Sequence, residues 1–90
     1  MNYSITIRGR GGHGSRPDRA YNPIDSFAAV FGALQHLNCR ITMVDGGTAA
    51  NVIPGELIFQ VEYCDGEQEL IRCLTPTCKL YHCSLDVKNL

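Results

Sequence analysis

The chain has 90 residues, of which 44% are hydrophobic and 19% are charged, and its formal net charge is −1. This length suits one domain with a single modest core. The charge argues against nucleic acid or an anionic membrane as a partner, because both require a cationic surface. No apolar run approaches the ~18 residues of a membrane span, and residues 1–10 lack a basic segment followed by an apolar core. We therefore expect a cytoplasmic protein or a piece of one.

The first part of the chain predicts a strand, a glycine-rich loop and a helix. Apolar and polar residues alternate over residues 2–8, NYSITIR, which is the pattern of a strand with one buried face. Residues 22–37, NPIDSFAAVFGALQHL, carry helix signals, with Asn22 as the N-cap and Pro23 at the first helical position. Apolar residues at spacings of three and four form one stripe that we expect to pack on a sheet: Ile24, Phe27, Ala28, Phe31, Leu34 and Leu37.

Two strands separated by a loop are predicted in the middle of the chain. Residues 39–44, CRITMV, place Ile41 and Met43 on one face of a strand. The segment 45–55, DGGTAANVIPG, holds three glycines and a proline, too many for a regular element to continue. Every second residue of 56–63, ELIFQVEY, is apolar or aromatic, which predicts a third, half-buried strand.

The last part predicts a second helix and a fourth strand. Asp65, with Gln68 three residues later, resembles a capping box that opens a helix through Leu74. Pro76 would break such a helix at a cost of roughly 3 kcal/mol, so we expect a kink or an early end there. Residues 84–88, SLDVK, alternate again and predict a short strand.

The resulting order of strand, helix, strand, strand, helix, strand is the split βαβ arrangement of ferredoxin-like α+β domains. In this arrangement two helices cover one face of a four-stranded antiparallel sheet. We therefore predict a single domain over residues 1–90. The second sheet face and an edge strand remain bare, and we expect a partner or the rest of a longer chain to cover them.

The five cysteines are an odd number without a CxxC pair, which argues against a fully paired disulfide framework. Cys73, Cys78 and Cys83 are spaced by five. On a helix this spacing turns each side chain about 140° from the last, so the three could not share one metal ion. We interpret the cysteines as ordinary thiols in a reducing compartment, with a zinc site or a redox pair as the alternative.

The three histidines do not suffice for metal-dependent hydrolysis by this chain alone. Such chemistry needs at least three His or carboxylate ligands that converge on one ion. His36 lies near the end of the first predicted helix and His82 at the turn into the last strand, and we interpret both as residues without a functional role. We therefore predict no metal site and no cofactor within this chain.

His13 lies in the glycine-rich loop of residues 8–18, RGRGGHGSRPD. A triad of Ser15, His13 and Asp18 is possible on paper, but residues this close on one loop rarely orient one another. A phosphate loop is disfavoured as well, since no lysine-serine pair follows. The glycines allow the backbone to approach a ligand or another chain, and the imidazole can donate a hydrogen bond to a developing negative charge.

A second loop, GGTAANVIP, repeats this design around Asn51. Both loops leave strand ends where they could lie near one another, and each offers one hydrogen-bonding side chain among small residues. The pair predicts half of a site that completes a pocket on another polypeptide.

The two stretches GRGGHGSRPDRAYNPI and GGTAANVIPGELIFQVEY, with a helix between them, resemble the dimerisation or lid domain of a zinc-dependent metallopeptidase family. This family includes aminoacylase, carboxypeptidase G, succinyl-diaminopimelate desuccinylase and the hippurate and auxin-conjugate amidohydrolases. The resemblance spans roughly Tyr3 to Glu62, and the GGHGS form is typical of the hippurate branch. The connection LQHLNCRIT is shorter than in that branch, and QVEYCDG lacks an arginine that many relatives carry there.

The resemblance implies one domain of a two-domain hydrolase that cleaves amide bonds of N-acyl amino acids or small peptides. The catalytic domain, with two zinc or similar divalent ions, lies outside this chain, so the isolated chain should be inactive. Relatives form homodimers through the edge strand and a helix of the lid. The residue matching His13 stabilises the oxyanion in the partner subunit's active site, and the residue matching Asn51 contacts the substrate.

Two other interpretations remain open. A free-standing ferredoxin-like regulatory module would use the glycine loops to bind a small anion such as a carboxylate, and the isolated chain would then show measurable ligand affinity. A purely structural domain would only dimerise, and loop substitutions would then leave the kinetics of the intact enzyme unchanged.

Overall fold

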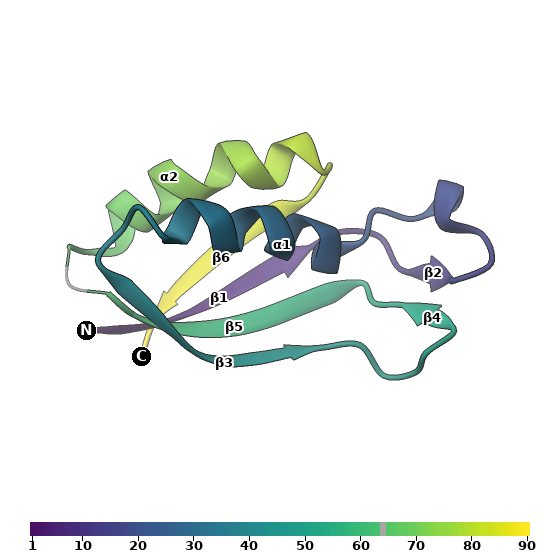
Figure 1. Ribbon diagram of the computed structural model, residues 1–90, viewed down its shortest axis with the longest axis horizontal. Coiled ribbons are helices and arrows are strands. Elements are labelled where there is room, and N and C mark those ends of the chain that lie inside the picture. The colour runs from purple at the N-terminus through teal and green to yellow at the C-terminus, as the bar shows by residue number, and fades with distance from the viewer. Residues whose placement is uncertain (64) are drawn as a thin grey trace.

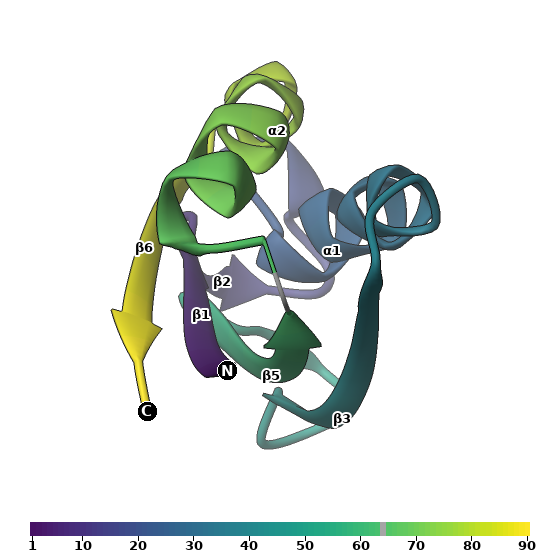
Figure 2. The same cartoon turned by 90° about the vertical axis from the view of Figure 1, so that its left-hand side faces the viewer.

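The computed structural model describes residues 1–63 and 65–90, and it confirms the predicted α+β class. The elements are β1 (Asn2–Arg8), β2 (Gly12–His13), a 3-10 helix η1 (Pro17–Arg19), α1 (Pro23–Leu34), β3 (Cys39–Gly46), β4 (Val52–Ile53), β5 (Glu56–Tyr63), α2 (Glu67–Leu80) and β6 (Ser84–Asn89). A four-stranded antiparallel sheet has the strand order β3-β5-β1-β6, and both α-helices lie on one of its faces (Figures 1 and 2). This is the split βαβ topology.

The core lies between the sheet and the helices, and it consists of the residues whose alternation predicted the strands. In the centre, Ile5 of β1 pairs with Phe59 of β5 and Val87 of β6, and all three are buried. The helix-facing residues of β1 and β5 are at most 2% exposed. The opposite sheet face carries mainly polar side chains, as expected of a sheet covered on one side only. Within the part of the chain that the structure describes, no helix is long and apolar enough to cross a membrane.

Helix α1 begins as predicted but buries a different face. The Asn22 side chain accepts a hydrogen bond from the Ile24 amide (3.0 Å), and Pro23 occupies the first turn. The helix ends at Leu34 rather than Leu37. Its buried residues are Pro23, Ser26, Val30 and Leu34, whereas Ile24, Ala28 and Phe31 are exposed. The predicted stripe is therefore correct only in part: Leu34 is buried and Phe27 and Leu37 pack against the core. Because the helix is apolar on two sides and contacts α2 as well as the sheet, packing selects which apolar residues are covered.

Strand β3 is an edge strand, and a β-bulge divides its predicted apolar face. Ile41 pairs with Val61 on the helix side, whereas Met43 pairs with Gln60 on the bare side. The register shifts between the two because the bulge places an extra residue in β3. Val44 returns to the helix side opposite Phe59 but stays 50% exposed, so the edge keeps an apolar margin.

The N-cap predicted for α2 and the early end predicted at Pro76 are both wrong. The N-cap is Gly66 with no side-chain cap bond, rather than Asp65, and its φ of 111° suits glycine. The helix also continues past Pro76 to Leu80. Leu74 and Cys78 on either side of Pro76 are buried. Their packing outweighs the missing hydrogen bond, since Pro76 itself lies on the exposed side.

Four cysteines of the described residues are free thiols: Cys39, Cys73, Cys78 and Cys83. The sequence interpretation also covers Cys64, which lies outside the described residues. Cys83 follows the end of α2 instead of continuing it, and both Cys78 and Cys83 are buried. Burial raises the pKa of these two thiols, which favours their protonated, unreactive form.

Tyr63 at the end of β5 gives a stability prediction. Its side chain is buried and its hydroxyl makes no hydrogen bond with a described residue. Burial, with smaller contributions from the Asp65 and Glu69 carboxylates, raises its pKa from 10.0 to about 12. Between these values the unfolded chain loses the phenol proton while the folded chain retains it. The free energy of unfolding should therefore fall as pH rises through this window.

The Tyr63→Phe variant removes the buried, unpaired hydroxyl. At pH 7 we expect its free energy of unfolding to equal that of the parent or to exceed it by up to about 1 kcal/mol. Between pH 10 and 12 it should lose less stability than the parent. Urea denaturation at neutral and alkaline pH measures both effects. Tyr3→Phe is the matched control, because the Tyr3 hydroxyl has a partner in Met1 Sδ (3.7 Å) and its removal should bring no gain. A less stable Tyr63→Phe at pH 7 would contradict the assignment.

Candidate functional site

The two loops expected to lie near one another pair directly as short strands, a pairing that the sequence does not predict. Strands β2 and β4 form a two-stranded antiparallel sheet with Gly12 opposite Ile53 and His13 opposite Val52. The Gly14 amide continues the pairing by donating to the Asn51 carbonyl oxygen (2.9 Å). We call residues 9–21 and 47–55 together the ribbon. Figure 1 shows that it projects from one end of the main sheet, away from the two chain ends.

The ribbon brings the two predicted site residues together. His13 lies on β2 and Asn51 immediately before β4, on directly neighbouring segments, and both side chains are exposed. Among the described residues, neither side chain takes part in a hydrogen bond. The structure thus places an exposed imidazole and an exposed carboxamide on adjoining backbone segments, and neither group has a hydrogen-bond partner among the described residues.

The Ser15 and Asp18 alternative finds no support in the local geometry. The His13 carbonyl oxygen accepts from the Arg16 amide (3.0 Å), and this turn contains Ser15. Asp18 lies in η1. Within the described part of the chain, no hydrogen bond joins the His13 imidazole to either side chain.

Glycines at the base of the ribbon are required by close packing. A Cβ on Gly9 would collide with the Tyr21 carbonyl oxygen and would lie 3.0 Å from Cys83 Sγ. A Cβ on Gly11 would lie 2.8 Å from the Ile53 carbonyl oxygen, closer than Cβ atoms normally come to a backbone oxygen. At Gly9 and Gly11, the glycines predicted to allow close approach of a ligand or another chain let two backbone segments of this chain approach each other.

Positive charge collects on the ribbon. Residues 8–19 include four arginines and one aspartate. Arg8 is engaged on the main sheet, where it faces Glu56 (Nε to Oε2, 3.6 Å) and Asp86 (Nη1 to Oδ2, 3.7 Å). Among the described residues, the arginines at 10, 16 and 19 form no ion pair. They give this end of a nearly neutral chain a local positive potential.

A cavity of about 400 Å³ lies beside the ribbon, between its second loop and the start of α1. Gly14 and Ala50, the neighbours of His13 and Asn51, both line it. Its remaining walls are mostly apolar or small, and the polar side chains of Asn22 and Thr48 are exceptions. The two site residues thus stand at the margin of an open, mainly apolar hollow.

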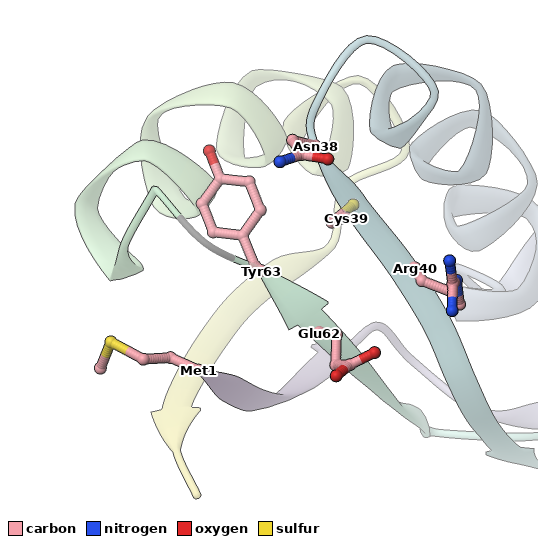
Figure 3. A pocket seen from close by; sticks show the side chains of 6 residues that line it. All are labelled: Met1, Asn38, Cys39, Arg40, Glu62 and Tyr63. Atoms are coloured by element: carbon pink, nitrogen blue, oxygen red, sulfur yellow. The ribbon is translucent and has the colours of Figure 1, made fainter.

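A second hollow, of about 210 Å³, lies near the chain ends (Figure 3). Its lining includes Arg40 and Glu62, which pair across β3 and β5, and Tyr63. Figure 3 shows that the Tyr63 hydroxyl and the Glu62 carboxylate point in different directions, so these groups do not converge on one ligand. Neither His13 nor Asn51 contributes to it.

The other histidines lie apart from the ribbon tip. His36 is exposed in the connection after α1, and His82 is exposed in the turn between α2 and β6. Among the described residues, no three His, Cys, Asp or Glu side chains form a group that could hold a metal ion.

Comparison with known proteins places the chain in a family. The model of the peptidase dimerisation domain matches residues 1–69. An N-acyl-L-amino acid amidohydrolase of Geobacillus stearothermophilus is 36% identical over 69 residues, which are 64% of this chain and 19% of the relative. A hippurate hydrolase of Campylobacter jejuni is 38% identical over 63 residues, which are 58% of this chain and 16% of the relative. A succinyl-diaminopimelate desuccinylase of Caulobacter vibrioides is 39% identical over 67 residues, or 60% and 17%.

Solved structures agree on the fold. An aminobenzoyl-glutamate utilization protein from Klebsiella pneumoniae superposes with a TM-score of 0.82 at 15% identity, over 98% of this chain and 27% of that one. A tripeptidase from Staphylococcus aureus superposes with a TM-score of 0.75 at 19% identity, over 97% of this chain and 27% of that one. The chain spans less than a fifth of the length of these curated relatives. With more than half of its length matched by the model, the chain belongs to the peptidase dimerisation domain family.

Proposed function

We propose that this chain is the dimerisation domain of a metal-dependent amidohydrolase or peptidase and that it completes the active site of the partner subunit. His13 donates a hydrogen bond to the oxyanion that forms when water attacks the substrate carbonyl, and Asn51 contacts the substrate. The observation that carries this proposal is the ribbon, which places His13 and Asn51 on neighbouring backbone segments with both side chains exposed and unpaired within the described residues. A donor of this kind is worth most in a water-excluded cavity, which another domain must supply.

The position of the ribbon favours a site on another subunit. Leu90 donates its amide to the Asn2 carbonyl oxygen (2.9 Å), so anything that precedes or follows this chain attaches at one end of the main sheet. The ribbon projects from the other end of a molecule 40 Å long (Figure 1). A catalytic domain joined near the chain ends is therefore remote from the His13 of its own chain.

The surface formed by β3 and α1 suits a second copy of this chain. Among the described residues, the outer edge of β3 pairs with no other strand, and α1 lies along the same side of the molecule (Figure 2). Four large apolar side chains are exposed on this surface: Ile24 (41%), Phe31 (49%), Met43 (44%) and Val44 (50%). A two-fold axis would place β3 against β3 and α1 beside α1, which pairs the open edge and covers these residues.

The names of the relatives point to amide-bond substrates with an acyl group, and the positive ribbon suits a substrate that carries a carboxylate. We place the two divalent ions of such an enzyme in the catalytic domain outside this chain. The role of the present chain is then to help bind and orient the substrate through Asn51 and to supply His13 as a hydrogen-bond donor to the oxyanion.

Subunit complementation tests the exchange of His13. One variant of the full-length enzyme carries His13→Ala, and a second is inactivated by substitution of a metal ligand in its catalytic domain. When equal amounts are unfolded and refolded together, half of the dimers are mixed, and each mixed dimer regains one of its two sites. We expect recovery of about a quarter of the parental turnover. A mixture as inactive as its components would show that His13 serves its own subunit or none.

A further inference from the structure

The base of the ribbon is held by a contact outside the two strands. Arg10 and Tyr21 exchange both backbone hydrogen bonds, from Arg10 N to Tyr21 O (2.8 Å) and from Tyr21 N to Arg10 O (2.9 Å). This bridge closes the loop that carries His13. The position of Tyr21 therefore sets where the outgoing and returning segments of the loop leave the main sheet.

The Tyr21 ring in turn contacts the turn between α2 and β6. Its centroid lies 4.8 Å from that of the His82 imidazole, with 38° between the ring planes. His82 has a φ of 57°, and it is the only residue other than glycine with positive φ in the described chain. Its conformation belongs to a Schellman motif, in which the His82 amide donates to the Lys79 carbonyl (3.0 Å) and the Cys83 amide to the Cys78 carbonyl (3.0 Å).

This turn is firmly anchored, and it lies at the ribbon end of the sheet. Cys78 and Cys83 on either side of the turn are buried, so its backbone is fixed by the core. Figure 1 shows that α2 ends and β6 begins close to the end of β1, where the ribbon departs. Gly9 passes between Tyr21 and Cys83 without room for a Cβ. The ribbon base thus contacts the α2–β6 turn in two ways: the Gly9 backbone lies against Cys83, and the Tyr21 ring lies against His82.

We propose that Tyr21 and His82 are positioning residues for His13: their ring contact fixes the ribbon base relative to the main sheet and so sets where the imidazole lies in the partner's active site. This inference rests on the proposed function. The two rings are poor candidates for a stability role, because Tyr21 is 43% exposed and His82 is also exposed. A small displacement at the base would be carried along the paired strands to the tip, where orientation of a donor strongly affects turnover.

The His82→Gly variant separates position from stability. Glycine is the preferred residue at this left-handed position, so the helix end should be as stable as in the parent or more so, while the ring contact is lost. We expect kcat of the full-length enzyme to fall about tenfold with KM nearly unchanged, since the loss concerns a transition-state contact. Tyr21→Ala should lower kcat by the same factor, whereas Tyr21→Phe, which keeps the ring, should retain most of the parental kcat. The double variant Tyr21→Ala with His82→Gly should have a kcat close to that of either single variant.

Tyr81→Ala is the matched control. Tyr81 is the neighbouring aromatic residue at the end of α2 and is 39% exposed, similar to Tyr21, but its ring forms no described contact with another aromatic ring. Its replacement should leave kcat unchanged. Equal losses in Tyr81→Ala and His82→Gly would overturn the positioning role, because the effect would then belong to the helix end in general.

A second readout does not depend on activity. Hydrogen exchange of the segment 9–21 in the full-length protein should be faster in His82→Gly and Tyr21→Ala than in the parent, and unchanged in Tyr21→Phe. The positioning role requires both faster exchange and lower kcat, and the absence of either overturns it. His13→Ala, measured in parallel, isolates the underlying function: if it leaves turnover unchanged, the proposed function fails even where the exchange results hold.

Discussion

Replacing His13 by alanine should lower kcat of the full-length enzyme by about 10²–10³, the usual loss for one oxyanion donor in a preorganised site. The change should leave the fold intact, because the His13 side chain is exposed and makes no hydrogen bond within the described residues. KM should change little, since the hydrogen bond strengthens only as the negative charge develops. Steady-state kinetics with an N-acyl amino acid measure kcat and KM. Circular dichroism and sedimentation show whether the variant folds and associates like the parent.

His36→Ala is the control for this experiment. His36 is another exposed histidine, but it follows α1 and lies outside the ribbon. Its loss should leave kcat at the parental value. If His13→Ala also retains near-parental turnover while folding and dimerising normally, His13 has no catalytic role and the purely structural interpretation of the domain prevails.

A lysine at Val44 should abolish association of the subunits. Val44 lies on the unpaired edge of β3 and is 50% exposed, so lysine fits the monomer at little cost. In a two-fold dimer each substitution occurs twice, which buries two charges against apolar neighbours and removes the contribution of the Val44 side chains. Sedimentation velocity should show monomers where the parent shows dimers. Turnover should fall about as far as in His13→Ala, because a monomer has no partner to supply the imidazole.

Leu80→Lys provides the matched substitution elsewhere. Leu80 is 79% exposed at the end of α2, away from the β3 edge, and a cation there suits the helix dipole. This variant should remain dimeric and active. A Val44→Lys enzyme that stays dimeric would exclude the β3 edge from the interface, and a monomeric enzyme with full turnover would exclude completion of the site by a partner.

The strands could be predicted from the sequence because each has one buried face. Alternation over residues 2–8, 56–63 and 84–88 locates β1, β5 and β6 to within a residue, since a shift by one position would expose the whole apolar set. The start of α1 was equally clear, because Asn22 and Pro23 act locally. These features depend on neighbours in the sequence and on one period, and they need no knowledge of the packing.

The errors concern features that tertiary packing decides. Which apolar side of α1 is buried depends on α2, and continuation of α2 through Pro76 depends on the burial of Leu74 and Cys78. The bulge in β3 follows from its register with β5 and has no local signal. At the site, the sequence identified His13 and Asn51 as a pair, but two paired residues per strand are too few to predict β2 and β4. Nothing in the sequence pointed to the contact of Tyr21 with His82.

The crowding at Gly9 and Gly11 bears on the energetics of assembly. A histidine at the tip of a slack loop would lose conformational entropy each time it entered the cavity of another subunit, and that loss would weaken docking. Here the backbone around His13 is already paired with β4 and wedged against its neighbours before any encounter. If His13 acts as proposed, its backbone would enter the partner's pocket already ordered, and the entropy cost of that ordering would be met during folding instead of at each association.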